Sequence, residues 1–275
     1  MNNKTLKRFL KHKGGLAGGV LVFVFIVCAI FAPQLAPCSP DRIDLKNVAS
    51  PPSLNHLLGT DKLGRDILSR ILYGTRISIY LSVLSTAGAL LFGVILGTVA
   101  GFYGGKVDFV VTLVADVLIS FPSFLLALAV VSFLGPGLSN LLIALSFSSC
   151  PRFFRIMRAA VLQTKQAEYV SAGCAIGANT LRIITVHIIP NSFSPVLVQS
   201  TLNLASSILT ASGLGFLGLG VQPPTPEWGL MVSEGRALLR TAPHVSLVPA
   251  CVIALYVLAF NLLGDALRDA LDVKL

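Results

Sequence analysis

The chain has 275 residues, of which 54% are hydrophobic and only 12% charged, and its mean hydropathy is +0.81. This composition excludes an ordinary soluble domain and indicates a polytopic membrane protein. A net charge of +9 is also typical of nucleic-acid-binding proteins, but here the basic residues are dispersed and gather only beside apolar runs. Membrane orientation therefore explains the charge better than nucleic acid does.

The first predicted element is a membrane span over residues 16–36, with residues 1–15 in the cytoplasm. Five basic residues precede the apolar run, namely Lys4, Lys7, Arg8, Lys11 and Lys13. A basic head and an apolar body are also the pattern of a signal peptide. However, the run is about as long as the roughly 20 residues that a bilayer requires, and the small residue expected just before a lipoprotein cysteine is missing before Cys38. We therefore predict an uncleaved span.

Residues 37–76 are polar and rich in proline, and we predict that they form an external loop. Within this loop, Asp61 or Asp66 can start a helix. An apolar stripe then follows at helical spacing, while three arginines stay on the polar side; the stripe is Ile67, Leu68, Ile71 and Leu72. The pattern is typical of a helix that lies at the membrane interface. The alternative is a plain lead-in to the next span.

The second and third spans are predicted over residues 77–101 and 108–134. The second contains small residues that allow close helix packing in lipid, namely Gly88, Gly93 and Gly97, and we expect them to contact a helix of another chain. The third contains Asp116 and Pro122, which are costly inside a membrane unless they face a cavity or the helix bundle. Asp116 is therefore a candidate pathway residue, with simple hydration near the interface as the alternative.

A fourth span is predicted over residues 138–160. Near its end, Arg152, Arg155 and Arg158 are spaced by three residues and so line roughly one face of the helix. At the cytoplasmic interface such side chains reach the lipid head groups and follow the positive-inside rule.

Residues 161–191 are predicted to form a cytoplasmic loop around a segment rich in polar and small residues, Glu168–Asn191. Glu168 suits the first turn of a short helix, where the backbone amides favour a negative charge. A narrow face of small residues flanked by two larger ones recurs at helical spacing, formed by Tyr169, Ala172, Gly173 and Ile176. Gly177 can end this helix in a left-handed conformation.

A second short helix is predicted after this turn. Asn179 or Thr180 can cap its start, and Pro190 ends or bends it. The segment is either a plain surface helix-turn-helix between two spans or a surface on which a partner protein docks.

The fifth and sixth spans are predicted over residues 192–214 and 245–263. Small residues on the fifth, with Ser207 among them, offer a close-packing face to a helix of another chain, and we expect Ser207 at that interface. Between the two spans lies an external loop rich in glycine that carries Trp228, the only tryptophan. We expect Trp228 to anchor the loop at the membrane interface or to help cap a pathway.

The positive-inside rule supports this topology. Under it, 13 of the 21 lysines and arginines fall in cytoplasmic segments and 8 in external ones, although the external loops are longer. The excess on the inside places both termini in the cytoplasm. We find no internal repeat of 20–50 residues and no linker that indicates a second domain.

Residue patterns for catalysis or metal binding are weak. The five cysteines, Cys28, Cys38, Cys150, Cys174 and Cys251, form no CxxC pair, so neither a disulfide framework nor a metal cage follows. His56 and His244 in the external segments are isolated from any other metal-ligand pattern. The sequence has no GxxxxGK[ST] loop, so if ATP drives this protein, another chain must bind it.

Four passages resemble one known family. Glu168, followed by small residues, Gly177 and Pro190, resembles the EAA loop of binding-protein-dependent ABC importer permeases. Near residue 60, LGTD followed by GRD, SR and GTR is similar to the C-type subunit of the dipeptide, oligopeptide and nickel branch of that family. The LGLG and PEWG passage around Trp228 and the final FNLLGDALRDALD are similar to the same branch. The resemblance covers about residues 50–275.

The chain departs from the family pattern at several positions. Gly173 stands where a second alanine is usual, and Cys150 replaces a common tryptophan. His187 stands where the general pattern is aliphatic, although a histidine is usual in this branch. Thr112 and Leu113 stand where the family has Met-Arg, so we expect no Arg–Asp pair at Asp116.

The resemblance implies an all-α, six-span permease with the type I ABC importer fold. It implies one half of a translocation pathway for dipeptides or oligopeptides in the bacterial inner membrane, with nickel as the alternative cargo. The implied partners are a second, B-type permease, two ATP-binding subunits and an extracytoplasmic substrate-binding protein. The ATP-binding subunits would dock on Glu168, Tyr169, Ala172, Gly173, Ile176 and Gly177. The chain itself would be no enzyme and would hold no cofactor.

Two other classes of membrane protein fit less well. A secondary transporter is expected to show inverted repeats and several ionisable groups within its spans, and Asp116 is the only plausible one here. An intramembrane protease requires a Ser/His, paired-Asp or HExxH constellation within the spans, and the sequence has none.

Overall fold

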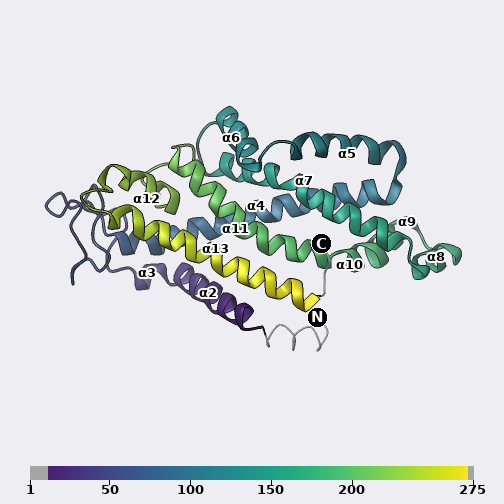
Figure 1. Ribbon diagram of the computed structural model, residues 1–275, viewed down its shortest axis with the longest axis horizontal. Helices are drawn as coiled ribbons and strands as arrows, with labels where there is room; N and C mark the ends of the chain where they lie inside the picture. The colour runs from purple at the N-terminus through teal and green to yellow at the C-terminus, as the bar shows by residue number, and fades with distance from the viewer. Residues whose placement is uncertain (1–11, 272–275) are drawn as a thin grey trace.

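The computed structural model describes residues 12–271, and this part of the chain is almost entirely helical (Figure 1). The elements, in order, are α2 (Lys13–Ile30), α3 (Ala32–Leu35), α4 (Ile67–Tyr103), α5 (Gly105–Ile119), α6 (Ser123–Leu134), α7 (Leu138–Lys165), α8 (Glu168–Ala175), α9 (Thr180–Arg182), the π-helix η1 (Ile183–Ile188), α10 (Ile189–Ser192), α11 (Ser194–Phe216), α12 (Trp228–Gly235), the 3₁₀-helix η2 (Arg236–Leu238) and α13 (His244–Leu271). Within residues 12–271 the only β pairing is an isolated bridge between Thr60 and Asp66. The predicted all-α class is confirmed.

Three helices are each long and apolar enough to cross a membrane: α2, α4 and α13. Two further pairs qualify only if each counts as one bent span, namely α5 with α6, and the segment Thr180–Ser192 with α11. Helix α7, which contains the predicted fourth span, is not among them, and its second half carries three arginines. Three to five spans are therefore recognised in residues 12–271, and the number six stays a prediction.

Helix α4 joins the predicted interfacial helix and the predicted second span into one helix of 37 residues. Asp66 caps its start, because the carboxylate accepts a hydrogen bond from the Ser69 amide at 2.8 Å. At 1.5 Å per residue the helix is about 55 Å long, well beyond the roughly 30 Å of hydrocarbon in a bilayer. The lead-in alternative therefore describes this helix. The interfacial alternative is wrong because Ile67 and Ile71 of the apolar stripe pack in the core of the chain and Arg70 of the polar side is fully buried.

The predicted third span is broken in the middle. Helix α5 ends at Ile119, α6 begins at Ser123, and the two axes differ by 93°. Pro122 lies at the break, where it lacks an amide hydrogen and disfavours a helical conformation in the residue before it. The two halves therefore leave a corner beside α7.

The glycines of α4 pack against α7 within the same chain. A Cβ on Gly93 would lie 2.4 Å from Cβ of Phe153, and one on Gly97 would lie 2.7 Å from the Phe154 carbonyl oxygen. A Cβ on Gly88 would likewise lie 2.7 Å from Oγ of Ser146. The prediction that these glycines contact a helix of another chain is wrong, because α7 of the same chain already occupies the space beside them.

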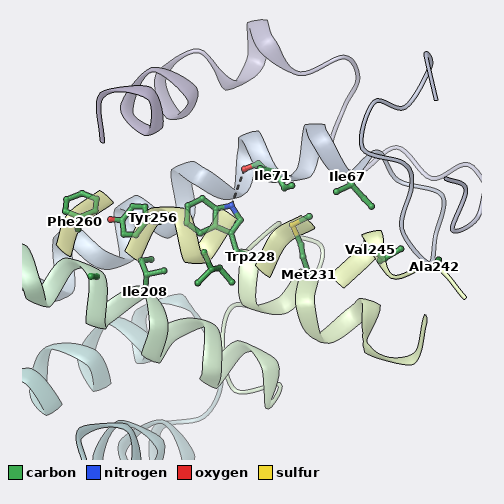
Figure 2. Close-up of a cluster of buried hydrophobic side chains, with 11 residues drawn as sticks. Ile67, Ile71, Ile208, Trp228, Met231, Ala242, Val245, Tyr256 and Phe260 are labelled. Atoms are coloured by element: carbon green, nitrogen blue, oxygen red, sulfur yellow. Dashed lines mark hydrogen bonds between the residues drawn. The ribbon is translucent and has the colours of Figure 1, made fainter. Parts of the chain in front are cut away.

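Trp228 lies in the core of the chain (Figure 2). Its ring packs against Phe25 and Tyr256, with centroid distances of 5.8 and 5.6 Å, and its Nε1 donates to the Ile71 carbonyl at 3.3 Å. The expected roles as interface anchor or pathway cap are wrong for this side chain. The indole is fully buried among residues of α2, α4 and α13.

The loop before α4 is tied to α12 by an outer ion cluster of Asp61, Arg65, Arg70 and Glu234. Arg65 donates from Nε to Asp61 Oδ2 at 2.6 Å and from Nη2 to Glu234 Oε2 at 2.9 Å. Arg70 is fully buried and lies 3.7 Å from Asp61 and 3.6 Å from Glu234. This cluster fixes the end of the molecule that lies opposite α8 (Figure 1).

Candidate functional site

Helix α8 stands at one end of the molecule, beyond the end of α7 (Figure 1). Val170 faces inward and belongs to a buried cluster with Met157 and Val161 of α7 and with Ile183 and Ile188 of η1. Because α8 is anchored on its inner side, a force applied to its outer side acts directly on α7 and η1.

The turn after α8 has the geometry that its glycine predicts. Gly177 adopts a φ of +82°, in the left-handed region. Its amide donates to the Cys174 carbonyl at 3.0 Å, and the Ala178 amide donates to the Gly173 carbonyl at 3.1 Å. These two bonds form a Schellman motif, which satisfies carbonyls that the helix end leaves free. The prediction that Gly177 ends this helix is confirmed.

The second short helix also starts as predicted. Oδ1 of Asn179 accepts a hydrogen bond from the Leu181 amide at 3.1 Å, so Asn179 is the cap and Thr180 is the first helical residue. The following π-helical stretch, η1, has no signal in the sequence that we recognised. A π-helix is often found at functional sites and here adjoins the anchored side of α8.

The outer side of this segment is apolar and exposed. Ile176 is 85% exposed and Leu181 67%, while Glu168, Tyr169 and Ala172 also face solvent in the isolated chain. Gly173 is different, because it is buried, like Val170 on the inner side of α8. A Cβ on Gly173 would meet nothing within 4 Å, so the alanine that is usual there would fit. The structure thus separates Gly173 from the other five predicted docking residues.

The segment from α8 to α10 is tied to the rest of the chain at both ends. At the start, Nζ of Lys165 donates to the Phe102 carbonyl at 2.6 Å, which links the end of α7 to the end of α4. At the far end, Oγ of Ser192 donates to Oγ1 of Thr164 at 2.9 Å. The segment is therefore positioned by α4 and α7, the two helices joined by the packed glycines.

A second candidate region is a charged face between α5 and α7. Nη2 of Arg155 donates to Oδ1 of Asp116 at 2.6 Å, and Nη2 of Arg158 donates to Oδ2 of Asp108 at 2.6 Å. The expectation that Asp116 has no arginine partner is wrong. The family arginine before Asp116 is absent in this chain, but α7 supplies Arg155 from 39 residues further along the sequence.

For an importer of the kind that the sequence resembles, we predict that Asp116→Asn keeps most of the transport activity and acquires no new pH dependence. The Arg155 and Asp116 side chains are 58% and 50% exposed, and ion pairs of this kind contribute only about 0–1 kcal/mol. An asparagine oxygen still accepts the hydrogen bond from Arg155. The measurement is ATP-driven uptake across the neutral pH range. The comparison variant is Asp108→Asn, which weakens a less exposed two-bond pair and is expected to lose more activity. If Asp116→Asn abolishes uptake in an assembled transporter, the carboxylate has a specific role that this prediction denies.

Ser207 does not lie on a free surface. It is only 3% exposed, and its Oγ accepts a hydrogen bond from Nδ2 of Asn203 at 3.2 Å; Nδ2 also donates to Thr86 Oγ1 on α4 at 3.0 Å. The expectation that Ser207 meets another chain is wrong, because this side of α11 packs on α4. The free side of α11 carries Ser206 and Leu209.

The external histidines make structural contacts. Nδ1 of His56 lies 3.0 Å from Oδ1 of Asp66, the residue that caps α4, and Nε2 of His244 lies 3.0 Å from the Ser50 carbonyl oxygen. Within residues 12–271 no group of three or more His, Cys, Asp or Glu side chains is arranged to hold a metal ion. The five cysteines of this part are free thiols.

Comparison with known protein families gives two matches. Residues 93–275 match the model of the binding-protein-dependent transport system inner membrane component, and residues 3–52 match the N-terminal transmembrane domain of oligopeptide transport permease C.

Among related sequences, the chain is 44% identical over 272 residues to a dipeptide transport system permease protein of Alkalihalophilus pseudofirmus, covering 99% of this chain and 90% of the relative. It is also 44% identical over 270 residues to a glutathione transport system permease protein of Pectobacterium atrosepticum, covering 98% of this chain and 90% of the relative. A di/tripeptide transport system permease protein of Pseudomonas aeruginosa is 44% identical over 273 residues, covering 97% of this chain and 90% of the relative.

Solved structures show a similar fold at low sequence identity. A chain of the inward-facing MetNI methionine ABC transporter superposes with a TM-score of 0.60 at 17% identity, covering 73% of this chain and 96% of that one. A chain of an amino acid ABC transporter superposes with a TM-score of 0.56 at 14% identity, covering 71% of this chain and 91% of that one. These similarities concern the fold alone.

Proposed function

The chain belongs to the family of binding-protein-dependent transport system inner membrane components, and from this premise we propose that it forms half of a pathway that imports short peptides. It is a permease subunit of an ABC importer and is not itself an enzyme. The observation that carries the peptide assignment is 44% identity, over nearly the whole chain, to permeases named for dipeptides, di/tripeptides and glutathione. Nickel, the alternative cargo, is not favoured by these relatives.

The proposed function is tested by peptide uptake into proteoliposomes. The vesicles contain this chain, its partner permease, the ATP-binding subunits and the substrate-binding protein, and all ion gradients are collapsed. We expect dipeptide uptake that requires both ATP and the binding protein. Uptake that follows an ion gradient and ignores ATP would instead identify a secondary transporter.

We propose that α8 and the turn at Gly177 insert into an ATP-binding subunit. The exposed apolar side chains Ile176 and Leu181 suit a small contact that excludes water at its centre. The anchoring of α8 on α7 supports this role, because closure of the ATP-binding subunits is then transmitted to the helices as a rigid displacement.

We propose that both termini lie in the cytoplasm, on the same side as α8. Nε2 of His12 lies 3.3 Å from Oδ2 of Asp269, so the start of α2 and the end of α13 are neighbours. In Figure 1 each of these is the end of its helix that is nearer to α8. The loop before α4 then faces outward, where Leu54 is 98% exposed, and we assign this end to the substrate-binding protein.

We propose that the partner permease packs on the free side of α11. A cysteine at Leu209, a side chain that is 61% exposed, is expected to crosslink to the partner in a nucleotide-dependent way. Ser207→Cys on the buried side and Val24→Cys on α2 are the matched controls and are expected to give no such crosslink. The readout is the fraction of heterodimer on a denaturing gel. Crosslinking at Val24 but not at Leu209 would place the interface on α2.

A further inference from the structure

The corner between α5, α6 and α7 encloses a hollow of about 200 Å³. Two arginines, Arg152 and Arg155, line it together with Ser123 and Ser148. Its remaining walls are largely apolar, formed by Leu118, Ile119, Phe121, Pro151 and Ile156. Since a water molecule takes up about 30 Å³ of liquid, the hollow has room for a carboxylate or phosphate group with some water.

The charges around the hollow do not cancel. Arg155 uses Nη2 for Asp116, and Arg158 uses its guanidinium for Asp108. Arg152 has no carboxylate within 4 Å anywhere in residues 12–271. None of the residues that line the hollow is acidic, and Asp116 on α5 is already paired with Arg155. One positive charge therefore stays uncompensated on this face.

The start of α6 adds to the positive potential. Its first backbone amides precede the first helical bond, in which the Leu126 amide donates to the Pro122 carbonyl at 3.1 Å. Amides in a first turn have no partner within their own helix and carry the positive end of the helix dipole. Ser123, the first residue of α6, lines the same hollow as Arg152.

Arg152 is exposed and has no carboxylate partner in residues 12–271, so its guanidinium is free to bind an anion that enters the hollow. The guanidinium fork also matches the geometry of a carboxylate or a phosphate better than that of a spherical anion. From these observations we infer that the hollow binds an oxyanion, with Arg152 as the main ligand and the free donors of Arg155 as the second. The oxyanion is either the phosphate of an anionic lipid head group or the terminal carboxylate of a peptide. The second source rests on the proposed function.

The test compares Arg152→Gln with Arg240→Gln, which removes an exposed arginine at the other end of the molecule, in two assays on the assembled transporter. In the first, native mass spectrometry counts phosphatidylglycerol and phosphatidylcholine molecules retained in detergent. In the second, proteoliposomes made only of zwitterionic lipid take up a dipeptide with a free carboxylate or its C-terminal amide. Arg152→Lys keeps the positive charge but lacks the planar guanidinium. In both assays its effect is expected to lie between those of the wild type and Arg152→Gln.

A lipid phosphate predicts that Arg152→Gln lowers retained phosphatidylglycerol at least threefold without changing phosphatidylcholine. A peptide carboxylate predicts that the wild type prefers the free acid over the amide and that Arg152→Gln removes this preference. If Arg152→Gln behaves like Arg240→Gln in both assays, the inference is overturned. If the wild type takes up neither peptide, the proposed function is contradicted, and the lipid assay, which involves no transport, still decides whether the site exists.

Discussion

Gly93→Ala is expected to lower the stability of the assembled transporter. The added methyl group would lie 2.4 Å from Cβ of Phe153 and 2.9 Å from the Phe154 amide nitrogen. Neither atom belongs to the flexible end of a side chain, so α4 and α7 must move apart along their contact. Overpacking of this kind costs about 1–3 kcal/mol, which outweighs the roughly 1 kcal/mol that alanine gains over glycine in a helix. The measurement is the thermal stability of the purified complex and its yield as a single species.

Gly19→Ala is the matched control. Gly19 lies in α2, and a Cβ there would meet nothing within 4 Å. The substitution therefore adds the same methyl group and the same helix preference without a clash, and we expect unchanged or slightly higher stability. Equal stability of the two variants would show that α4 and α7 do not pack as closely as the structure indicates.

Gly177→Val is expected to abolish transport while the protein still inserts and folds. Valine is strongly disfavoured at a φ of +82°, so the turn after α8 must change its conformation. A Cβ at this position meets nothing within 4 Å in the chain itself, so the fold has no packing reason to fail. The expected result is a complex that hydrolyses ATP without peptide uptake, or one that binds the ATP-binding subunits poorly.

Three further variants separate the backbone geometry of this turn from other effects. Gly177→Asn retains the left-handed conformation at low cost and is expected to keep coupling between ATP hydrolysis and uptake. Gly173→Ala tests the neighbouring glycine, which has open space around its Cβ, and is expected to be neutral or mildly stabilising. Glu168→Ala, at the start of α8, is expected to weaken association with the ATP-binding subunits without abolishing it. Normal uptake by Gly177→Val would rule out a coupling role for this turn.

The sequence determined the features that depend on composition and on neighbours along the chain. The bilayer thickness fixes the length of an apolar run, so the class of protein follows from composition and from runs such as the one in α2. The cap by Asp66, the left-handed Gly177 and the cap by Asn179 are made by residues at most five positions apart. Such bonds form whichever helices pack nearby, and these predictions are confirmed.

Only the tertiary structure decided which face of each helix packs against other helices of the chain. An apolar helix in a membrane has similar residues toward lipid and toward protein, so the sequence did not separate the buried Ser207 from the exposed Leu209 on α11. The same reason explains why α7, not another chain, fills the space at Gly93, and why Trp228 is buried beside Tyr256. The pair of Asp116 and Arg155 likewise depends on how α5 lies against α7. Contacts between residues tens of positions apart are set by helix packing, and no local pattern in this sequence encodes them.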